Sequence, residues 1–242
     1  MSGAAPDTWV QSMISRFEAD NAALVAPTRS LLRAVIPTPA THARFLNTLS
    51  MLEHMGGQKI MATQHGAAID QPTLKHIAEE TRHAFFFKRK AEHLAGRALA
   101  YVGPDLLSPA STGGYFRRLE ATLKRALATH ADRRLTYLYM SLAIEFRAVW
   151  AYGIYQQELN HAGALLSLKS LLAEENGHMG DMTRRIAAVG ALDLEPMAGF
   201  CAVERRLFER MLEGFSQAIA EPEADRAPRL AAAVGALSSA PA

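Results

Sequence analysis

Two four-residue patterns decide the fold of this chain: Glu80-Thr81-Arg82-His83 and Glu175-Asn176-Gly177-His178. Each lies in a stretch whose apolar residues recur every three or four positions, which indicates a helix with one face turned toward a core. A glutamate and a histidine three positions apart lie on nearly the same face of a helix. Each pattern therefore presents a carboxylate and an imidazole to the interior.

Two further glutamates occupy inward positions. Glu53 follows Leu49, and Glu145 follows Leu142, at helical spacing within apolar stretches. Four buried carboxylates are costly unless cations neutralise them, and two divalent cations carry the required charge. The alternative is a buried polar cluster held by hydrogen bonds alone. We predict a two-metal site with the ligands Glu53, Glu80, His83, Glu145, Glu175 and His178.

The spacing of the motifs supports this interpretation. Nine histidines and sixteen glutamates in 242 residues give about 0.6 Glu-x-x-His patterns by chance, and the chain has three. The third, Glu158 to His161, falls at the end of a helix before Gly163 and has no partner helix with an inward glutamate, so we exclude it. Glu53 precedes Glu80 by 27 residues and Glu145 precedes Glu175 by 30, so each pair is expected on one helical hairpin.

The order Glu, Glu-x-x-His, Glu, Glu-x-x-His resembles that of the ferritin-like di-iron carboxylate superfamily, in particular the compact single-chain oxygenases and oxidases. The resemblance covers roughly residues 40 to 190. It implies an all-α fold, a ferritin-like four-helix bundle with a long crossover, and extra helices at both ends of a single domain, residues 1–242. It also implies two iron ions, with manganese in place of one as an alternative. The metal-binding helices are expected at about residues 41–65, 71–96, 131–159 and 162–190.

Glu79 and Glu174 each precede the glutamate of a motif. In many di-iron oxygenases an acid at this place hydrogen-bonds a ligand histidine of the opposite half, and the two glutamates resemble that arrangement. The family more often has aspartate here. The alternative is that both are exposed glutamates without a role in the site.

Four residues are candidates for the wall of a substrate cavity. Gly56 and Gly57 follow Glu53 by one turn, where glycine costs about 1 kcal/mol relative to alanine. They leave space beside the metals or allow two helices to approach closely. Phe87 and Tyr152 lie on the inward faces of their helices, where packing is the alternative role.

The resemblance implies an enzyme that activates O2 to oxidise or oxygenate a small organic substrate, with an external electron donor. Ribonucleotide reductase subunits carry a radical tyrosine where this chain has Phe87, and bacterioferritin has its haem-ligating methionine within the first motif, where this chain has Thr81 and Arg82. One alternative function is that of a ferroxidase or peroxide-handling protein. Another is hydroxylation of a nucleoside in tRNA.

The composition suits a globular protein, since 49% of the residues are hydrophobic and 21% are charged. The net charge of +2 argues neither for nor against a nucleic-acid partner. The paired arginines of the chain are typical of solvated helix faces, so we do not expect such a partner. No secretory signal or membrane-spanning segment is recognised, so we expect a cytoplasmic protein without a membrane partner. An apolar stripe from Phe200 to Phe215 either covers the bundle or forms a homodimer interface.

Overall fold

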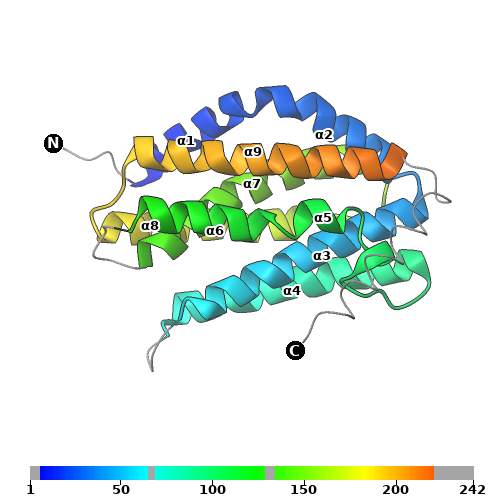
Figure 1. The fold of residues 1–242 in the computed structure, drawn as a ribbon, viewed down its shortest axis with the longest axis horizontal. Helices are drawn as coiled ribbons and strands as arrows, with labels where there is room; N and C mark the ends of the chain where they lie inside the picture. The colour runs from blue at the N-terminus through cyan, green and yellow to red at the C-terminus, as the bar shows by residue number, and fades with distance from the viewer. Residues whose placement is uncertain (1–5, 65–68, 129–133, 221–242) are drawn as a thin grey trace.

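A computed structural model describes residues 6–64, 69–128 and 134–220, and all regular structure in these ranges is helical (Figure 1). The prediction of an all-α fold is confirmed. In chain order the elements are α1 (Pro6–Asp20), α2 (Ala22–Val35), α3 (Pro39–Ala62), α4 (Gln71–Ala95), the 3-10 helix η1 (Gly103–Asp105), α5 (Pro109–Thr112), α6 (Tyr115–Ala126), α7 (Arg134–His161), α8 (Lys169–Ala188) and α9 (Leu194–Ala220).

Helices α3 and α4 form the first hairpin (Figure 1). The hydroxyl of Ser50 on α3 donates a hydrogen bond of 2.5 Å to the carbonyl of Ala84 on α4. The start of α4 is capped by Asp70, which accepts a hydrogen bond of 2.8 Å from the amide of Thr73. Its end is set by Gly96, whose φ of 65° favours glycine. Local signals thus define the helix that carries the first motif.

Helices α7 and α8 form the second hairpin. The side chain of Gln156 on α7 accepts a hydrogen bond of 2.5 Å from the amide of Leu168, the residue before α8. The sequence prediction placed a helix at 162–190, whereas α8 begins at Lys169. The difference arises at Gly163, whose φ of 63° ends the preceding helix, and residues 164–168 form a connection without regular structure. Residues 65 and 131–133, which we expected to be helical, lie outside the described ranges.

The remaining helices cover the two hairpins. In Figure 1, α9 and α6 cross in front of α7 and α8, and α1 and α2 lie above them. The apolar stripe of α9 is directed into the chain, because Phe200, Met211 and Phe215 are all buried. This stripe therefore covers the bundle in the monomer. A homodimer through another surface stays an untested prediction.

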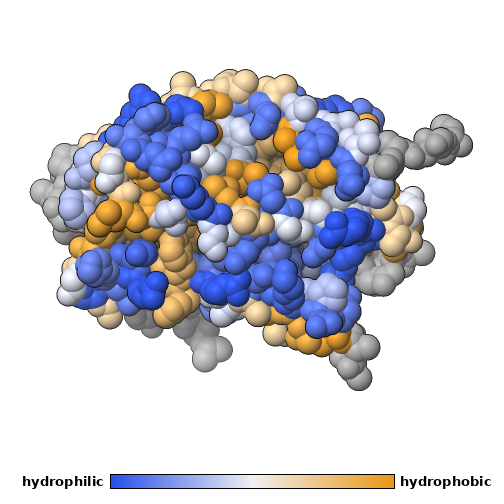
Figure 2. Space-filling view, turned by 180° about the vertical axis from the view of Figure 1, so that it is seen from behind, coloured by the Kyte–Doolittle hydropathy of each residue, from blue (hydrophilic) through white to orange (hydrophobic). Residues whose placement is uncertain are grey.

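The surface carries hydrophilic and hydrophobic residues in alternation. Figure 2 shows hydrophobic residues in separate patches between hydrophilic ones on the face opposite to that of Figure 1. Within the described residues, every helix falls short of the combined length and apolar character that crossing a lipid bilayer requires.

Candidate metal centre

The six residues predicted to bind metal converge between the two hairpins. All of them are buried, with an exposed fraction of 8% or less. They come from four helices: Glu53 lies on α3, Glu80 and His83 on α4, Glu145 on α7, and Glu175 and His178 on α8. Because the hairpins bring these helices together, residues more than a hundred positions apart in the sequence become neighbours.

Two overlapping groups of ligand atoms could each hold one metal ion. We define position A as His76, Glu80, Glu145 and His178, and position B as Glu53, Glu80, His83 and Glu175. Within each group, one ligand atom from every residue lies within 4.8 Å of the others. Glu80 belongs to both groups, and a carboxylate has two oxygens that can contact different ions. The arrangement therefore suits a dinuclear centre.

Two histidine nitrogens in these groups are buried and make no hydrogen bond within the described part of the chain: Nε2 of His76 and Nδ1 of His83. His76 Nε2 lies 3.1 Å from an oxygen of Glu145 and 3.3 Å from one of Glu80. His83 Nδ1 lies 3.1 Å from an oxygen of Glu175. A buried nitrogen without a partner is costly. A cation between nitrogen and carboxylate oxygens satisfies both, so the donor set fits a metal ion.

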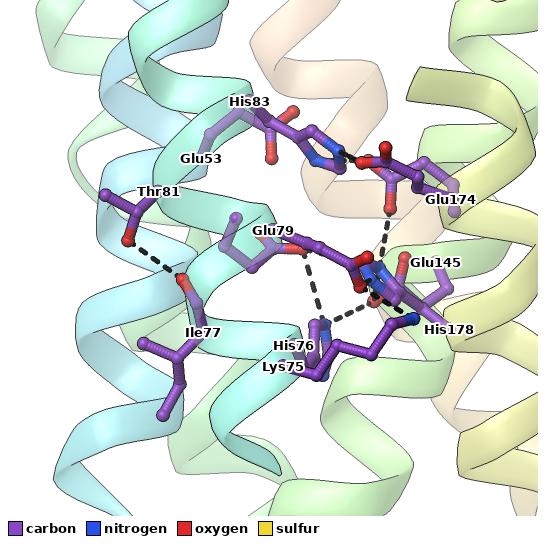
Figure 3. A network of polar contacts seen from close by, with 12 residues as sticks. Glu53, Lys75, His76, Ile77, Glu79, Thr81, His83, Glu145, Glu174 and His178 are labelled. Carbon is purple, nitrogen blue, oxygen red and sulfur yellow. Dashed lines mark hydrogen bonds and ion pairs between the residues drawn. The ribbon is translucent and has the colours of Figure 1, made fainter. Parts of the chain in front are cut away.

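The opposite nitrogens of His83 and His178 are held by glutamates of the other hairpin (Figure 3). Nε2 of His83 lies 2.7 Å from Glu174 on α8, and Nε2 of His178 lies 2.9 Å from Glu79 on α4. A carboxylate accepts a hydrogen bond, so each Nε2 carries the proton and each Nδ1 offers its lone pair to the cluster. The crosswise hydrogen bonds implied by the sequence resemblance are thus present.

His76 is the residue of the cluster that sequence reasoning missed. It lies on α4, one helical turn before Glu80, and is 3% exposed. Its Nδ1 lies 3.4 Å from the hydroxyl of Tyr137 on α7, and Figure 3 shows its ring beside Glu145 and His178. The signal was the spacing His-x-x-x-Glu-x-x-His, which puts three ligands on one helix face.

The cluster carries an excess of negative charge. Burial, and then the charge of neighbouring Glu80, raise the pKa of Glu53 well above its usual value. Burial acts in the same sense on Glu145, but attraction to the nearby imidazoles of His178 and His76 outweighs it and lowers the pKa of Glu145 to about 2. Burial lowers the pKa of His178, but its carboxylate neighbours outweigh that effect and raise the pKa to about 12. His178 and His76 thus partly neutralise the carboxylates around them. Bound divalent cations can take over this role.

A cavity of about 1180 Å³ opens beside the cluster. Gly56, Tyr152 and the ligand Glu53 line it, and the hydroxyl of Tyr152 donates a hydrogen bond to Glu53. A Cβ atom at Gly56 would lie 3.1 Å from Oε2 of Glu80, so glycine leaves this carboxylate its space. Most of the exposed wall is apolar and includes Leu49, Leu52, Ile60, Phe116, Ile144 and Met211, and charged residues such as Lys59, Glu120, Lys124 and Arg185 line the cavity as well.

Two of the residues predicted to line a substrate cavity do not line it. Gly57 faces α4, where an added Cβ would lie 3.4 Å from the Cβ of Glu80, so this glycine serves close helix packing. Phe87 is fully buried and packs against Tyr152, with 5.6 Å between the ring centroids. Phe87 therefore packs in the core against the ring of Tyr152, and Tyr152 lies between Phe87 and the cavity.

The third Glu-x-x-His pattern lies outside the cluster, as the sequence analysis proposed. Glu158 is 2% exposed and makes ion pairs of 2.6 Å with Arg29 and 2.8 Å with Arg33 on α2. The side chain of His161 is 67% exposed. This pattern therefore joins α7 to α2 and serves packing.

Comparison with known proteins gave no match for the chain. No family model matches it, no curated protein matches it, and no solved structure matches it. The geometry of the cluster and of the cavity beside it therefore indicates the function.

Proposed function

We propose that the protein is a non-haem di-iron enzyme that activates O2 to oxidise or oxygenate an organic substrate. The observation that carries the proposal is the pair of buried ligand groups that share Glu80. Two bound ferrous ions with mixed carboxylate and imidazole ligands supply the electrons for reduction of O2. Manganese in place of one iron is the alternative metal content.

The helical arrangement supports a ferritin-like bundle as the scaffold. The two hairpins each contribute a lone glutamate and a Glu-x-x-His motif, and a crossover from Gly96 to Arg134 connects them. Such a crossover lets the second hairpin lie beside the first with its ligands at the same height. The crosswise hydrogen bonds of Glu79 and Glu174 orient the ligand histidines and hold a proton on each Nε2, so that each Nδ1 faces the place a metal ion would take.

The cavity supports an organic substrate over iron storage. The cavity has a volume of about 1180 Å³ and borders Glu53 and Tyr152 directly. Most of its exposed wall is apolar. Apolar cavities with a few convergent polar groups are typical of small-molecule sites. Within this cavity, Tyr152 holds the carboxylate of Glu53 in place and separates it from the apolar core behind.

Anaerobic loading with ferrous iron followed by exposure to O2 tests the proposal. We expect two iron ions per chain by elemental analysis, O2 consumption in an oxygen electrode, and continued consumption with an external electron donor. The variant Glu175→Ala should lose iron and O2 uptake. The matched control His161→Ala removes a histidine of the same motif type outside the cluster and should retain both.

The alternatives give different results in the same experiment. Uptake and oxidation of many ferrous ions per chain would identify a ferroxidase. Absence of bound metal from both the wild type and the control would contradict the di-iron enzyme and the ferroxidase together.

A further inference from the structure

The two candidate metal positions differ in their donor atoms. Position A combines two imidazoles, His76 and His178, with two carboxylates. Position B combines one imidazole, His83, with three carboxylates. The second imidazole at position A comes from His76, because each Glu-x-x-His motif gives one histidine to one position. The third carboxylate at position B comes from Glu53, since Glu80 is shared by both positions.

The surroundings of His76 are those of a ligand. Its Nε2 is buried without a hydrogen bond and lies within 3.3 Å of Glu80 and Glu145. Its ring centroid lies 4.1 Å from that of His178, so both imidazoles approach the same point. Its other nitrogen faces the hydroxyl of Tyr137, which fixes the ring as the glutamates fix the other histidines.

We propose that His76 is a seventh ligand and makes the two positions unequal. Position A binds Fe²⁺, Co²⁺ or Zn²⁺ more tightly, and position B is where Mn²⁺ competes best. Imidazole favours the later first-row metals, whereas carboxylate oxygen suits Mn²⁺. Three carboxylates at position B also attract a hard divalent ion more strongly through charge. The inference rests on the dinuclear centre of the proposed function and assigns an order of occupancy within it.

Titration of metal-free protein with Co²⁺ tests the inference without O2 or substrate. Calorimetry and the visible absorption of bound Co²⁺ should resolve two binding steps in the wild type. The variant His76→Ala should weaken the tighter step at least tenfold and leave the other step within about twofold. His76→Gln provides a second variant of closer size, and thermal unfolding checks that both variants are folded.

The control is His161→Ala, which should retain both steps at wild-type affinity. Unchanged binding in folded His76 variants would overturn the assignment of His76 as a ligand. Equal weakening of both steps would overturn the inequality of the two positions. Because catalysis is not measured, a protein that binds two ions unequally but consumes no O2 would contradict only the proposed function.

Equilibration of metal-free protein with equal amounts of Co²⁺ and Mn²⁺ assigns the ions to positions. Anomalous X-ray scattering at the two absorption edges should place cobalt at position A and manganese at position B. The reverse placement, or the same mixture at both positions, would overturn the proposal. In His76→Ala, the preference of cobalt for position A should disappear.

Discussion

His178 on α8 donates a hydrogen bond of 2.9 Å from Nε2 to Glu79 on α4, across the interface between the two hairpins. The mirror contact joins His83 on α4 to Glu174 on α8 over 2.7 Å. Each hairpin therefore orients a histidine of the other. The metal centre and the packing of the hairpins depend on the same two contacts.

Removal of either glutamate should weaken one metal position selectively. Glu79→Ala leaves His178 without its acceptor, so position A should lose about 10–100-fold in Co²⁺ affinity. Glu174→Ala should have the same effect on position B through His83. Glutamine at either place keeps an acceptor oxygen and should recover most of the affinity. Titration calorimetry of the metal-free variants measures this, with the exposed Glu213→Ala as control. Wild-type affinity in both alanine variants would contradict the orienting role.

The buried ion pair of Arg147 and Glu204 should be essential for stability. Glu204 is fully buried, and Arg147 donates to it over 3.0 Å from Nε and 2.9 Å from Nη2. Arg147→Met should lower the free energy of unfolding by about 3–5 kcal/mol, because the carboxylate stays buried without its cation. The double variant Arg147→Met with Glu204→Leu should recover a large part of this loss. Urea unfolding in the presence of a chelator measures both. A double variant no more stable than the single one would contradict this account.

Two glycines of α9 should respond in opposite directions to alanine. A Cβ atom at Gly214 would lie 1.8 Å from Oγ and 2.7 Å from Cβ of Ser111, so Gly214→Ala should destabilise the fold by about 1–3 kcal/mol. A Cβ atom added at Gly199 would meet no atom within 4 Å beyond its chain neighbours and its own helix backbone, so Gly199→Ala should stabilise the helix by about 0.5–1 kcal/mol. Thermal unfolding distinguishes the two. Combination with Ser111→Gly should rescue Gly214→Ala, and failure of the rescue would place the clash elsewhere.

Stability should fall in mildly acidic solution because of His42. This side chain is 5% exposed, its Nε2 pairs with the hydroxyl of Tyr155, and burial lowers its pKa from 6.5 to about 4. Between these pH values the unfolded chain binds a proton that the folded chain does not. The free energy of unfolding should therefore decrease by up to about 3 kcal/mol as the pH falls from 6.5 to 4.

The variant His42→Gln isolates this contribution. Its stability should differ from that of the wild type by a constant amount above pH 6.5, and the difference should shrink toward pH 4. Chemical unfolding of both proteins at a series of pH values, with metal removed, measures the difference. A difference that does not depend on pH would show that His42 titrates normally in the folded chain.

Several elements of the fold were predictable because their signals are local. The start of α4 follows from Asp70 and Pro72, and its end from Gly96. The helical register of Glu80 and His83 also follows from spacing alone. Other features were not predictable. The start of α8 at Lys169 depends on how Gln156 holds the amide of Leu168, which is a contact between elements.

In the site, too, some features follow from local sequence signals and others from contacts between helices. The periodicity of the chain placed the six predicted ligands on inward helix faces, and the structure brings all six together. It could not distinguish Gly56, beside the carboxylate of Glu80, from Gly57, which packs against its Cβ. Periodicity also gave Glu158 the pattern of a metal ligand, and only the lack of a partner helix with an inward glutamate excluded it. In the structure Glu158 is buried and pairs with Arg29.

The sequence by itself determined the all-α class and the helix face on which each glutamate and histidine lies, because these depend on spacing within a single helix. Only the tertiary structure decided which faces meet. His76 joins the cluster because α4 packs with that face toward Glu145 on α7, and the orienting glutamates act across the hairpins. Such contacts depend on the relative rotation and depth of helices distant in the chain, which residue spacing does not encode.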